Sequence, residues 1–172
     1  MIEKTETDTS RATMKQQARS WFAVVRTYQE CHRRYARLLS RFGLTVTQFD
    51  VLSAIHRRDN RATPCEIAEE LLVTRGNITG VLQRLRDNGL ITTQRHQADG
   101  RSFICAMTPE GETVMIKART AASLFIATQM APFDESALKH TERQMDEMHE
   151  HLLSIDPEAI ATEVITQYEP TT

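Results

Sequence analysis

The sequence has few cysteines, no long apolar run and no secretory signal. Its three cysteines, Cys31, Cys65 and Cys105, are far apart and odd in number, so we expect no disulfide framework. No apolar run reaches the roughly 18 residues that a membrane-spanning helix needs. Residues 1–17 are polar and lack the apolar segment of a secretory signal. We therefore expect a cytoplasmic protein without a membrane partner.

The sequence also lacks the short motifs of common enzymes and metal sites. It contains no G-x-S-x-G elbow, no phosphate-binding loop and no paired metal motif. His149 and His151 are two residues apart, which on a helix directs them about 200° away from each other. We predict that the protein is not an enzyme and binds neither a metal nor a cofactor.

Charge is unevenly distributed along the chain, although the net charge is only −2. Residues 15–41 carry seven lysines and arginines against one acid, and residues 75–101 carry five arginines against two acids. Residues 102–172 carry four basic and twelve acidic side chains. This distribution is compatible with two basic zones that could face a nucleic acid.

Four helices are predicted before residue 90. Apolar residues three and four apart indicate a helix over about 15–42. Thr45, Thr63 and Thr74 are predicted N-caps of the next three helices, the first two with a Gln or Glu three residues later as a capping box. Gly89 is the expected end of the fourth helix.

The rest of the chain predicts a hairpin followed by further helices. Residues 90–107 hold two runs of β-favouring residues around an Asp-Gly turn. Helices are expected at about 108–130 and 134–153, and then a short helix or a mobile tail. The order of elements predicts a mainly α protein with a small β-hairpin wing, a winged helix-turn-helix with long N- and C-terminal helices.

We predict three parts along the chain. Residues 1–14 form a flexible tail, residues 15–153 a single unit, and residues 154–172 a C-terminal extension. Within the single unit, residues 45–107 form the winged-helix part that would bind DNA.

The helix that begins at Thr74 contains two glycines on one side. A glycine inside a helix costs about 0.5–1 kcal/mol relative to alanine. At about 100° per residue, Gly76 and Gly80 fall opposite the apolar face, where small residues would let the backbone enter a major groove. Alternatively, Gly76 costs little in the first turn and Gly80 meets another helix. The predicted buried face consists of Ile78, Val81, Leu82 and Leu85.

Polar side chains flank the two glycines. Asn77, Thr79 and Gln83 can present hydrogen-bonding groups to base edges, and the neighbouring arginines can reach guanine or phosphate. The candidate DNA contacts on this helix and the strand after it are Arg75, Gly76, Asn77, Thr79, Gly80, Gln83, Arg84, Arg86, Arg95 and His96.

Four segments of the sequence resemble the MarR family of bacterial winged-helix regulators, chiefly over residues 43–115. They are GLTVTQFDVLSAI, TPCEIAEELLVTRGNITGVLQRLRDNGLI, QADGRS and MTPEGE. The resemblance implies that Arg101 of the wing contacts the minor groove, with Asp99 supporting it. It also implies that Thr63 and Thr74 anchor phosphates. An arginine suits a narrow, electronegative minor groove.

The resemblance further implies a homodimer formed by helices in 15–43 and 108–153, bound to a pseudo-palindromic site in double-stranded DNA. Half-sites would lie about 34–36 Å apart. The apolar content of these helices agrees, although the same residues could complete a monomer's core. The residues in question are Trp21, Phe22, Leu124, Phe125, Ile126 and Leu152.

In similar proteins a small, often aromatic or phenolic effector binds between the winged part and the dimer helices, and we expect a repressor of nearby genes released in this way. The candidate effector residues are Trp21, Tyr28, His32, Tyr35 and His56. Packing explains the presence of these residues equally well.

Two alternative functions remain. The first is a redox sensor that uses Cys31, whose neighbours His32 and Arg33 would favour a thiolate. The second is a protein-interaction adaptor that does not bind DNA.

Overall fold

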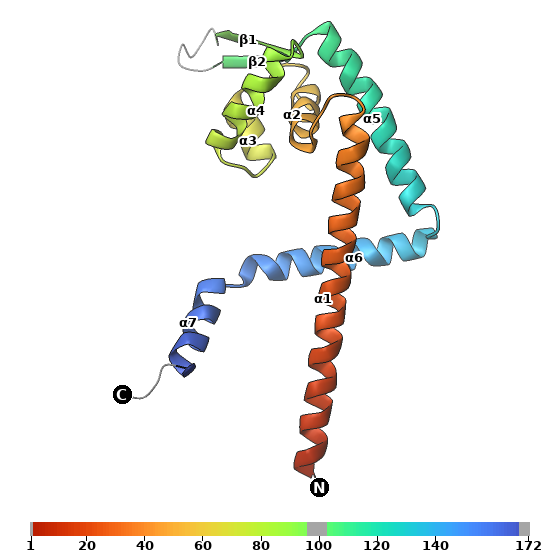
Figure 1. The fold of residues 1–172 in the computed structure, drawn as a ribbon, viewed down its shortest axis with the longest axis vertical. Helices are drawn as coiled ribbons and strands as arrows, with labels where there is room; N and C mark the ends of the chain where they lie inside the picture. Colours follow the sequence, from red (N-terminus) through yellow and green to blue (C-terminus); the bar gives the residue numbers. More distant parts are fainter. Residues whose placement is uncertain (1, 96–102, 169–172) are drawn as a thin grey trace. The chain divides into compact units, whose positions relative to one another are not determined.

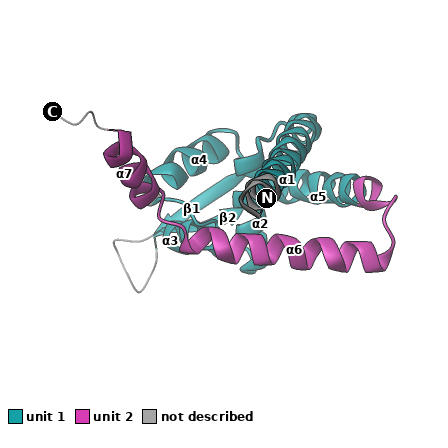
Figure 2. Cartoon of the chain, turned by 90° about the horizontal axis from the view of Figure 1, so that it is seen from below, with its two compact units in different colours: residues 1–126 teal, residues 127–172 magenta. Residues whose placement is uncertain are grey.

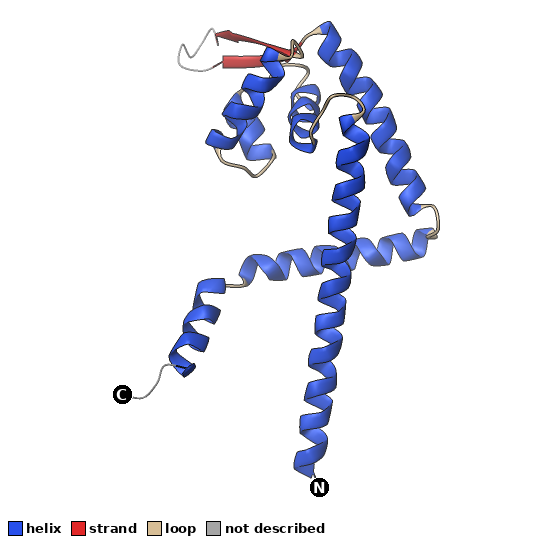
Figure 3. Cartoon of the chain, in the orientation of Figure 1, coloured by secondary structure: helices blue, strands red, loops and turns tan. Residues whose placement is uncertain are grey.

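The computed structural model describes residues 2–95 and 103–168; the side chains of residues 2–10 and of Arg75 lie outside this description. Helices and a two-stranded antiparallel sheet make up the described chain (Figures 1 and 3), which confirms the predicted fold class. In chain order the elements are α1 (Ile2–Ser40), α2 (Val46–Arg57), α3 (Pro64–Glu70), α4 (Arg75–Asp87), β1 (Ile91–Arg95), β2 (Phe103–Met107), α5 (Pro109–Met130), α6 (Glu135–Ser154) and α7 (Pro157–Tyr168).

The N-terminal segment is helical, contrary to the flexible tail predicted for residues 1–14. Helix α1 begins at Ile2 and continues to Ser40 without a break. The chain has neither glycine nor proline before Gly43, so nothing in this stretch interrupts a helix. The prediction gave polarity too much weight, because a polar segment without glycine or proline can still be helical. At the other end, residues Pro157–Tyr168 form helix α7, the helical one of the two expected alternatives.

The three predicted threonine N-caps are confirmed. The backbone N–H of Gln48 donates to Thr45 Oγ1 at 3.2 Å, and the N–H of Glu66 donates to Thr63 Oγ1 at 3.3 Å. Both Gln48 and Glu66 accept a bond back from the cap's own N–H, which completes two capping boxes. Thr74 caps α4. These caps fix where each helix of the helix-turn-helix begins.

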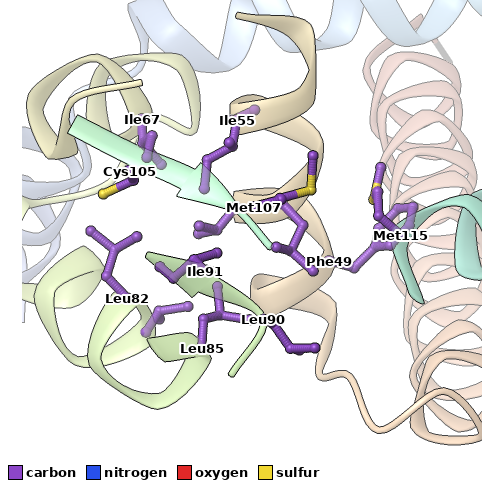
Figure 4. Close-up of a cluster of buried hydrophobic side chains, with 14 of the residues drawn as sticks. Phe49, Ile55, Ile67, Leu82, Leu85, Leu90, Ile91, Cys105, Met107 and Met115 are labelled. Atoms are coloured by element: carbon purple, nitrogen blue, oxygen red, sulfur yellow. The ribbon is translucent and has the colours of Figure 1, made fainter. Parts of the chain in front are cut away.

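The core lies among α2, α3, α4, the hairpin and the adjoining parts of α1 and α5 (Figure 4). Burying such side chains stabilises a fold by about 25 cal/mol per Å² of apolar surface. This core holds α4 against the rest of the unit and so determines which side of α4 faces outward. Its largest fully buried side chains are Leu39, Val51, Leu52, Ile55, Ile67, Ile78, Leu85, Ile91 and Cys105.

Strand β1 pairs with β2 in an antiparallel register that runs from Ile91 opposite Met107 to Arg95 opposite Phe103. A third segment joins this sheet through Ala62, which exchanges backbone hydrogen bonds of 2.8 and 3.2 Å with Cys105. The predicted turn at residues 96–102 lies outside the described residues. The hairpin therefore projects from α4 as the predicted wing, anchored on both sides of β2.

The contacts divide the chain into residues 1–126 and residues 127–172 (Figure 2). The first unit contains the winged-helix part with α1 and most of α5. The second contains α6 and α7, neither of which has a buried residue. The single unit predicted over 15–153 spans this division and stays a prediction.

Candidate DNA interface

Helix α4 presents one apolar and one polar side, as its sequence predicts. Ile78 and Leu85 are fully buried, and Val81 and Leu82 are nearly so. This confirms the predicted buried face. The residues that lie on the outward side are all exposed: Gly76, Asn77, Thr79, Gly80, Gln83, Arg84 and Arg86.

The two glycines of α4 face open space. A Cβ built on Gly80 would meet no atom of the described residues within 4 Å, and one on Gly76 would meet only Thr74 Oγ1 at 4.0 Å. The alternative that Gly80 contacts another helix of this chain is therefore wrong for the described residues. Packing within the chain does not require glycine at either position.

Gln83 lies at the centre of a hydrogen-bonded group on the exposed side of α4. Its Nε2 donates to Asp87 Oδ1 at 2.7 Å, and its Oε1 accepts a hydrogen bond from the guanidinium of Arg86. The amide is thereby held in one orientation on the helix surface. A held amide loses less side-chain entropy when it bonds a base edge than a free one does.

The exposed side of α4 continues onto the hairpin through a pocket of about 300 Å³. Thr93 of β1 and Phe103 of β2 line it from the wing, and Phe103 remains half exposed. Neither residue was predicted, since strand alternation indicates which side of the hairpin a residue occupies but not that this side faces α4. The other lining residues are Pro64, Thr79, Leu82, Gln83, Arg86 and Cys105.

The remaining predicted DNA contacts are only partly described. Arg95 ends β1 and is exposed, whereas His96, Asp99 and Arg101 lie outside the described residues, as does the side chain of Arg75. The Thr63 hydroxyl caps α3 and donates to Glu66 Oε2 at 2.7 Å.

The five candidate effector residues form separate contacts. Tyr28 and His32 have ring centroids 5.8 Å apart, and Tyr35 packs against Phe49 and Phe125. Trp21 makes an edge contact with its neighbour on α1. His56 lies on α2, where its Nε2 is 3.0 Å from the guanidinium of Arg119. The structure brings together Tyr28 and His32, and places the other three in contacts of their own.

Two ionisable groups at the junction of α1 and α2 are perturbed. Burial raises the pKa of Asp50, while the positive charges of Arg57 and His32 act in the opposite direction. Burial and the nearby Asp50 carboxylate raise the pKa of Tyr35. This junction is therefore a partly desolvated region with an acid and a phenol close together.

The cysteines occupy three different environments. Cys105 is fully buried in β2, and burial raises the pKa of its thiol to about 11. Cys65 is partly buried and its Sγ donates to Glu69 at 3.2 Å. Cys31 is partly buried on α1. Among the described side chains of residues 11–95 and 103–168, no three His, Cys, Asp or Glu are grouped to hold a metal ion. None of the helices described is both long and apolar enough to cross a bilayer.

A model of the MarR family matches residues 42–102. An uncharacterized HTH-type transcriptional regulator of Bacillus cereus is 30% identical over 136 residues, which cover 76% of this chain and 87% of the relative. The chain belongs to the MarR family. Its members are DNA-binding transcriptional regulators and not enzymes, and this chain is therefore a MarR-family transcriptional regulator.

Two further relatives carry more specific names. The organic hydroperoxide resistance transcriptional regulator of Bacillus subtilis is 28% identical over 105 residues, 61% of this chain and 71% of that protein. The transcriptional activatory protein BadR of Rhodopseudomonas palustris is 24% identical over 161 residues, 92% of both chains.

Several solved structures share the fold. A MarR family transcription regulator superposes with a TM-score of 0.74 at 20% identity, covering 82% of this chain and 93% of that one. A mutant of E. coli MarR complexed with operator DNA gives 0.66 at 21% identity, covering 73% and 89%. An organohalide-sensing regulator in its 2,4-dichlorophenol-bound form gives 0.71 at 13% identity, covering 78% and 80%. The winged helix-turn-helix is common to all of them.

Proposed function

We propose that this MarR-family regulator is a homodimeric repressor that binds a pseudo-palindromic operator through α4 and the wing and is released by a small aromatic or phenolic effector. The observation that supports DNA binding is the bare face of α4, which is formed by Gly76 and Gly80 and has no side chains. The major groove admits an α-helix, and glycine at Gly76 and Gly80 lets the backbone approach the bases closely. The E. coli MarR complex with operator DNA, which shares this fold, supports the proposal.

The polar residues of α4 divide between base edges and phosphates. Asn77, Thr79 and Gln83 flank the glycines and can donate to or accept from base edges. Arg75, Arg84 and Arg86 would bind guanine or the phosphates that border the groove. Thr63 and Thr74 begin helices at the DNA-facing side, where backbone N–H groups at helix N-termini attract phosphate.

The wing supplies a second contact in the minor groove. Arg101 would enter it, supported by Asp99, because a narrow groove concentrates negative potential. Arg95, at the end of β1 nearest the turn, and His96 would bind the adjoining phosphates.

The dimer is supported by apolar surface that one chain leaves uncovered. Trp21 and Phe22 on α1 are more than half exposed, as are Ile126 on α5 and Leu152 on α6. Phe125 packs instead against Tyr35 of its own chain. Basic residues surround the exposed patch on α1, and acidic residues surround those of the C-terminal helices, so a second copy would bring opposite charges together.

Release by an effector would be a shift between two separations of the wings. The candidate lining residues Trp21, Tyr28, His32, Tyr35 and His56 belong to α1 and α2, beside the helices that would set that separation. The neighbour with bound 2,4-dichlorophenol supports a phenolic ligand. A bound dimer would repress by excluding other proteins from its site, although BadR is named an activatory protein.

Selection of bound sequences from a random DNA pool tests this function, repeated with phenols and aromatic acids present. We expect a near-palindromic consensus with half-sites about one helical turn apart and weaker retention with at least one added compound. If no fragment is enriched over random DNA at physiological salt, the protein is a winged-helix adaptor for other proteins rather than a regulator of this kind. A reporter gene placed behind the selected site then distinguishes repression from activation.

A redox sensor is the second candidate, carried by Cys31 and by the similarity to the organic hydroperoxide regulator. Cys31 lies close enough to Tyr35 to influence its ionisation. Peroxide should release the wild-type protein from its operator and leave Cys31→Ser bound. Equal response of both proteins would exclude this candidate.

A further inference from the structure

Leu72, in the turn between α3 and α4, has an unusual backbone conformation and an unusual exposure. Its φ is +53°, in the left-handed region that favours glycine. Its side chain is 90% exposed. Packing within the free chain does not explain why a large apolar residue occupies an exposed position with a strained backbone.

The turn itself explains the backbone conformation but not the leucine. The N–H of Leu72 donates to Glu69 O at 3.2 Å, and the N–H of Val73 donates to Ala68 O at 3.0 Å. These two bonds form the Schellman motif that ends α3, and glycine is the usual residue at the left-handed position. Glycine would make both bonds without strain. The leucine side chain is therefore dispensable for the turn.

The surface around Leu72 is continuous with the start of α4. Leu72, Val73 and the N-cap Thr74 line one open hollow of about 460 Å³, together with Cys65, Ala68 and Glu69 of α3. Gly76, at the beginning of the bare face of α4, is two residues beyond Thr74. Helix α4 carries three arginines, Arg75 at its start and Arg84 and Arg86 near its end, against one acid, Asp87. A partner seated on the start of α4 therefore also reaches Leu72, and this helix favours a polyanion.

We propose that Leu72 contacts the operator, packing its apolar side chain on deoxyribose and base-methyl groups beside the point where α4 enters the groove. The inference rests on the proposed reading of DNA by α4. Strained residues that persist despite an available relaxed substitute are often tied to function, and apolar contacts to thymine methyl groups are an established form of base recognition.

Three substitutions test the contact, using the full-length protein and the sequence selected by the wild type. Leu72→Gly removes the side chain and the strain, Leu72→Asn keeps a side chain that tolerates a left-handed backbone but is polar, and Leu72→Met keeps an apolar side chain. We expect Leu72→Gly to unfold about 2–4 °C higher and to bind the operator at least fivefold more weakly. Leu72→Asn should lose a similar factor, and Leu72→Met should stay within twofold of wild type.

The salt dependence separates an apolar contact from a phosphate contact. The slope of log affinity against log salt should be unchanged in all three variants, because no charge is lost. Wild-type affinity in Leu72→Gly or Leu72→Asn, or an equal loss in Leu72→Met, would overturn the inference while leaving DNA reading by α4 intact. Failure of the wild type to select any sequence would instead overturn the proposed function.

Discussion

At the scale of single residues, Gly80 is the position where a substitution best distinguishes an effect on the packing of the chain from an effect on DNA binding. Nothing in the described residues lies within 4 Å of the Cβ that it lacks. The free chain would accept a larger residue there and would gain from one, since alanine is a better helix former. Packing among the described residues does not account for this glycine, whereas the proposed entry of α4 into a DNA groove would.

Substitution of Gly80 should change binding and stability in opposite directions. Gly80→Glu should leave the fold intact and weaken operator binding at least tenfold, about 1.4 kcal/mol, through bulk and charge repulsion against phosphates. Gly80→Ala is the matched variant and should raise the free energy of unfolding by about 0.5–1 kcal/mol. Gel shift and urea unfolding measure the two effects. An operator affinity within twofold of wild type for Gly80→Glu would show that this face does not meet DNA.

Asp50 should make stability depend on pH. Its pKa is raised in the folded state by burial, so the folded protein holds this proton more tightly than the unfolded chain does. The stability associated with Asp50 is therefore greatest below the unfolded pKa and falls as pH rises through the folded pKa. Asp50→Asn should be more stable than wild type at pH 7 and lose that advantage near pH 3 in urea titrations. An advantage that is the same at both pH values would contradict this cause.

At the scale of elements, the start of α5 is joined tightly to the end of α4. A Cβ on Gly111 would lie 2.0 Å from the carbonyl oxygen of Leu90. Thr108 bonds the same segment, donating from its hydroxyl to Gly89 O at 2.7 Å and from its N–H to Leu90 O at 3.0 Å. Asn60 connects the wing to α5: its Oδ1 accepts a hydrogen bond from the Met107 N–H, and its Nδ2 donates one to the Glu112 carboxylate on α5. This joint links the helix that would form the dimer to the helix that would read DNA.

Gly111→Ala should break that joint. The clash is with backbone rather than with a flexible side chain, so α5 must move away from the α4 terminus. We expect a loss of about 1–3 kcal/mol in the free energy of unfolding. Gly80→Ala is the control, because the same substitution in open space should stabilise. A loss below about 0.5 kcal/mol would show that the joint yields easily.

The wing is expected to act through Arg101. Arg101→Ala should cost operator binding about 1–3 kcal/mol, comparable to one good base contact, and leave the oligomeric state unchanged. Fluorescence anisotropy with labelled operator measures the first quantity and sedimentation the second. Unchanged affinity would remove the wing from the mechanism, even if α4 reads DNA as proposed.

At the scale of the whole molecule, many large apolar side chains are exposed on α1, α5, α6 and α7, and exposed apolar surface often marks an interface with a partner. Ile126 lies in this surface on α5 and is about half exposed. Ile126→Glu should convert the proposed dimer to a monomer in sedimentation experiments and abolish operator binding with it. Thr120→Glu adds the same charge about 120° around the helix and should leave the dimer intact. A dimer in both variants would place the interface elsewhere.

The local sequence was sufficient for much of this regulator. Helix boundaries follow from caps such as Thr45 and Thr63, whose side chains bond groups only three residues away. The buried and exposed sides of α4 follow from helical periodicity around Ile78 and Gly80. These features depend on interactions within one or two turns, and they were confirmed. The helical start of α1 was missed because a polar sequence does not by itself exclude a helix.

The tertiary structure alone decided the features that join distant segments. Gly111 meets Leu90, Phe103 joins Thr79 around one pocket, and the candidate effector residues form separate contacts, none of which periodicity can show. Leu72 belongs here as well, since its sequence does not reveal a left-handed backbone. Capping hydrogen bonds and the buried side of a helix depend on residues that are close together in the sequence. Close approach between distant segments depends instead on how the complete core packs.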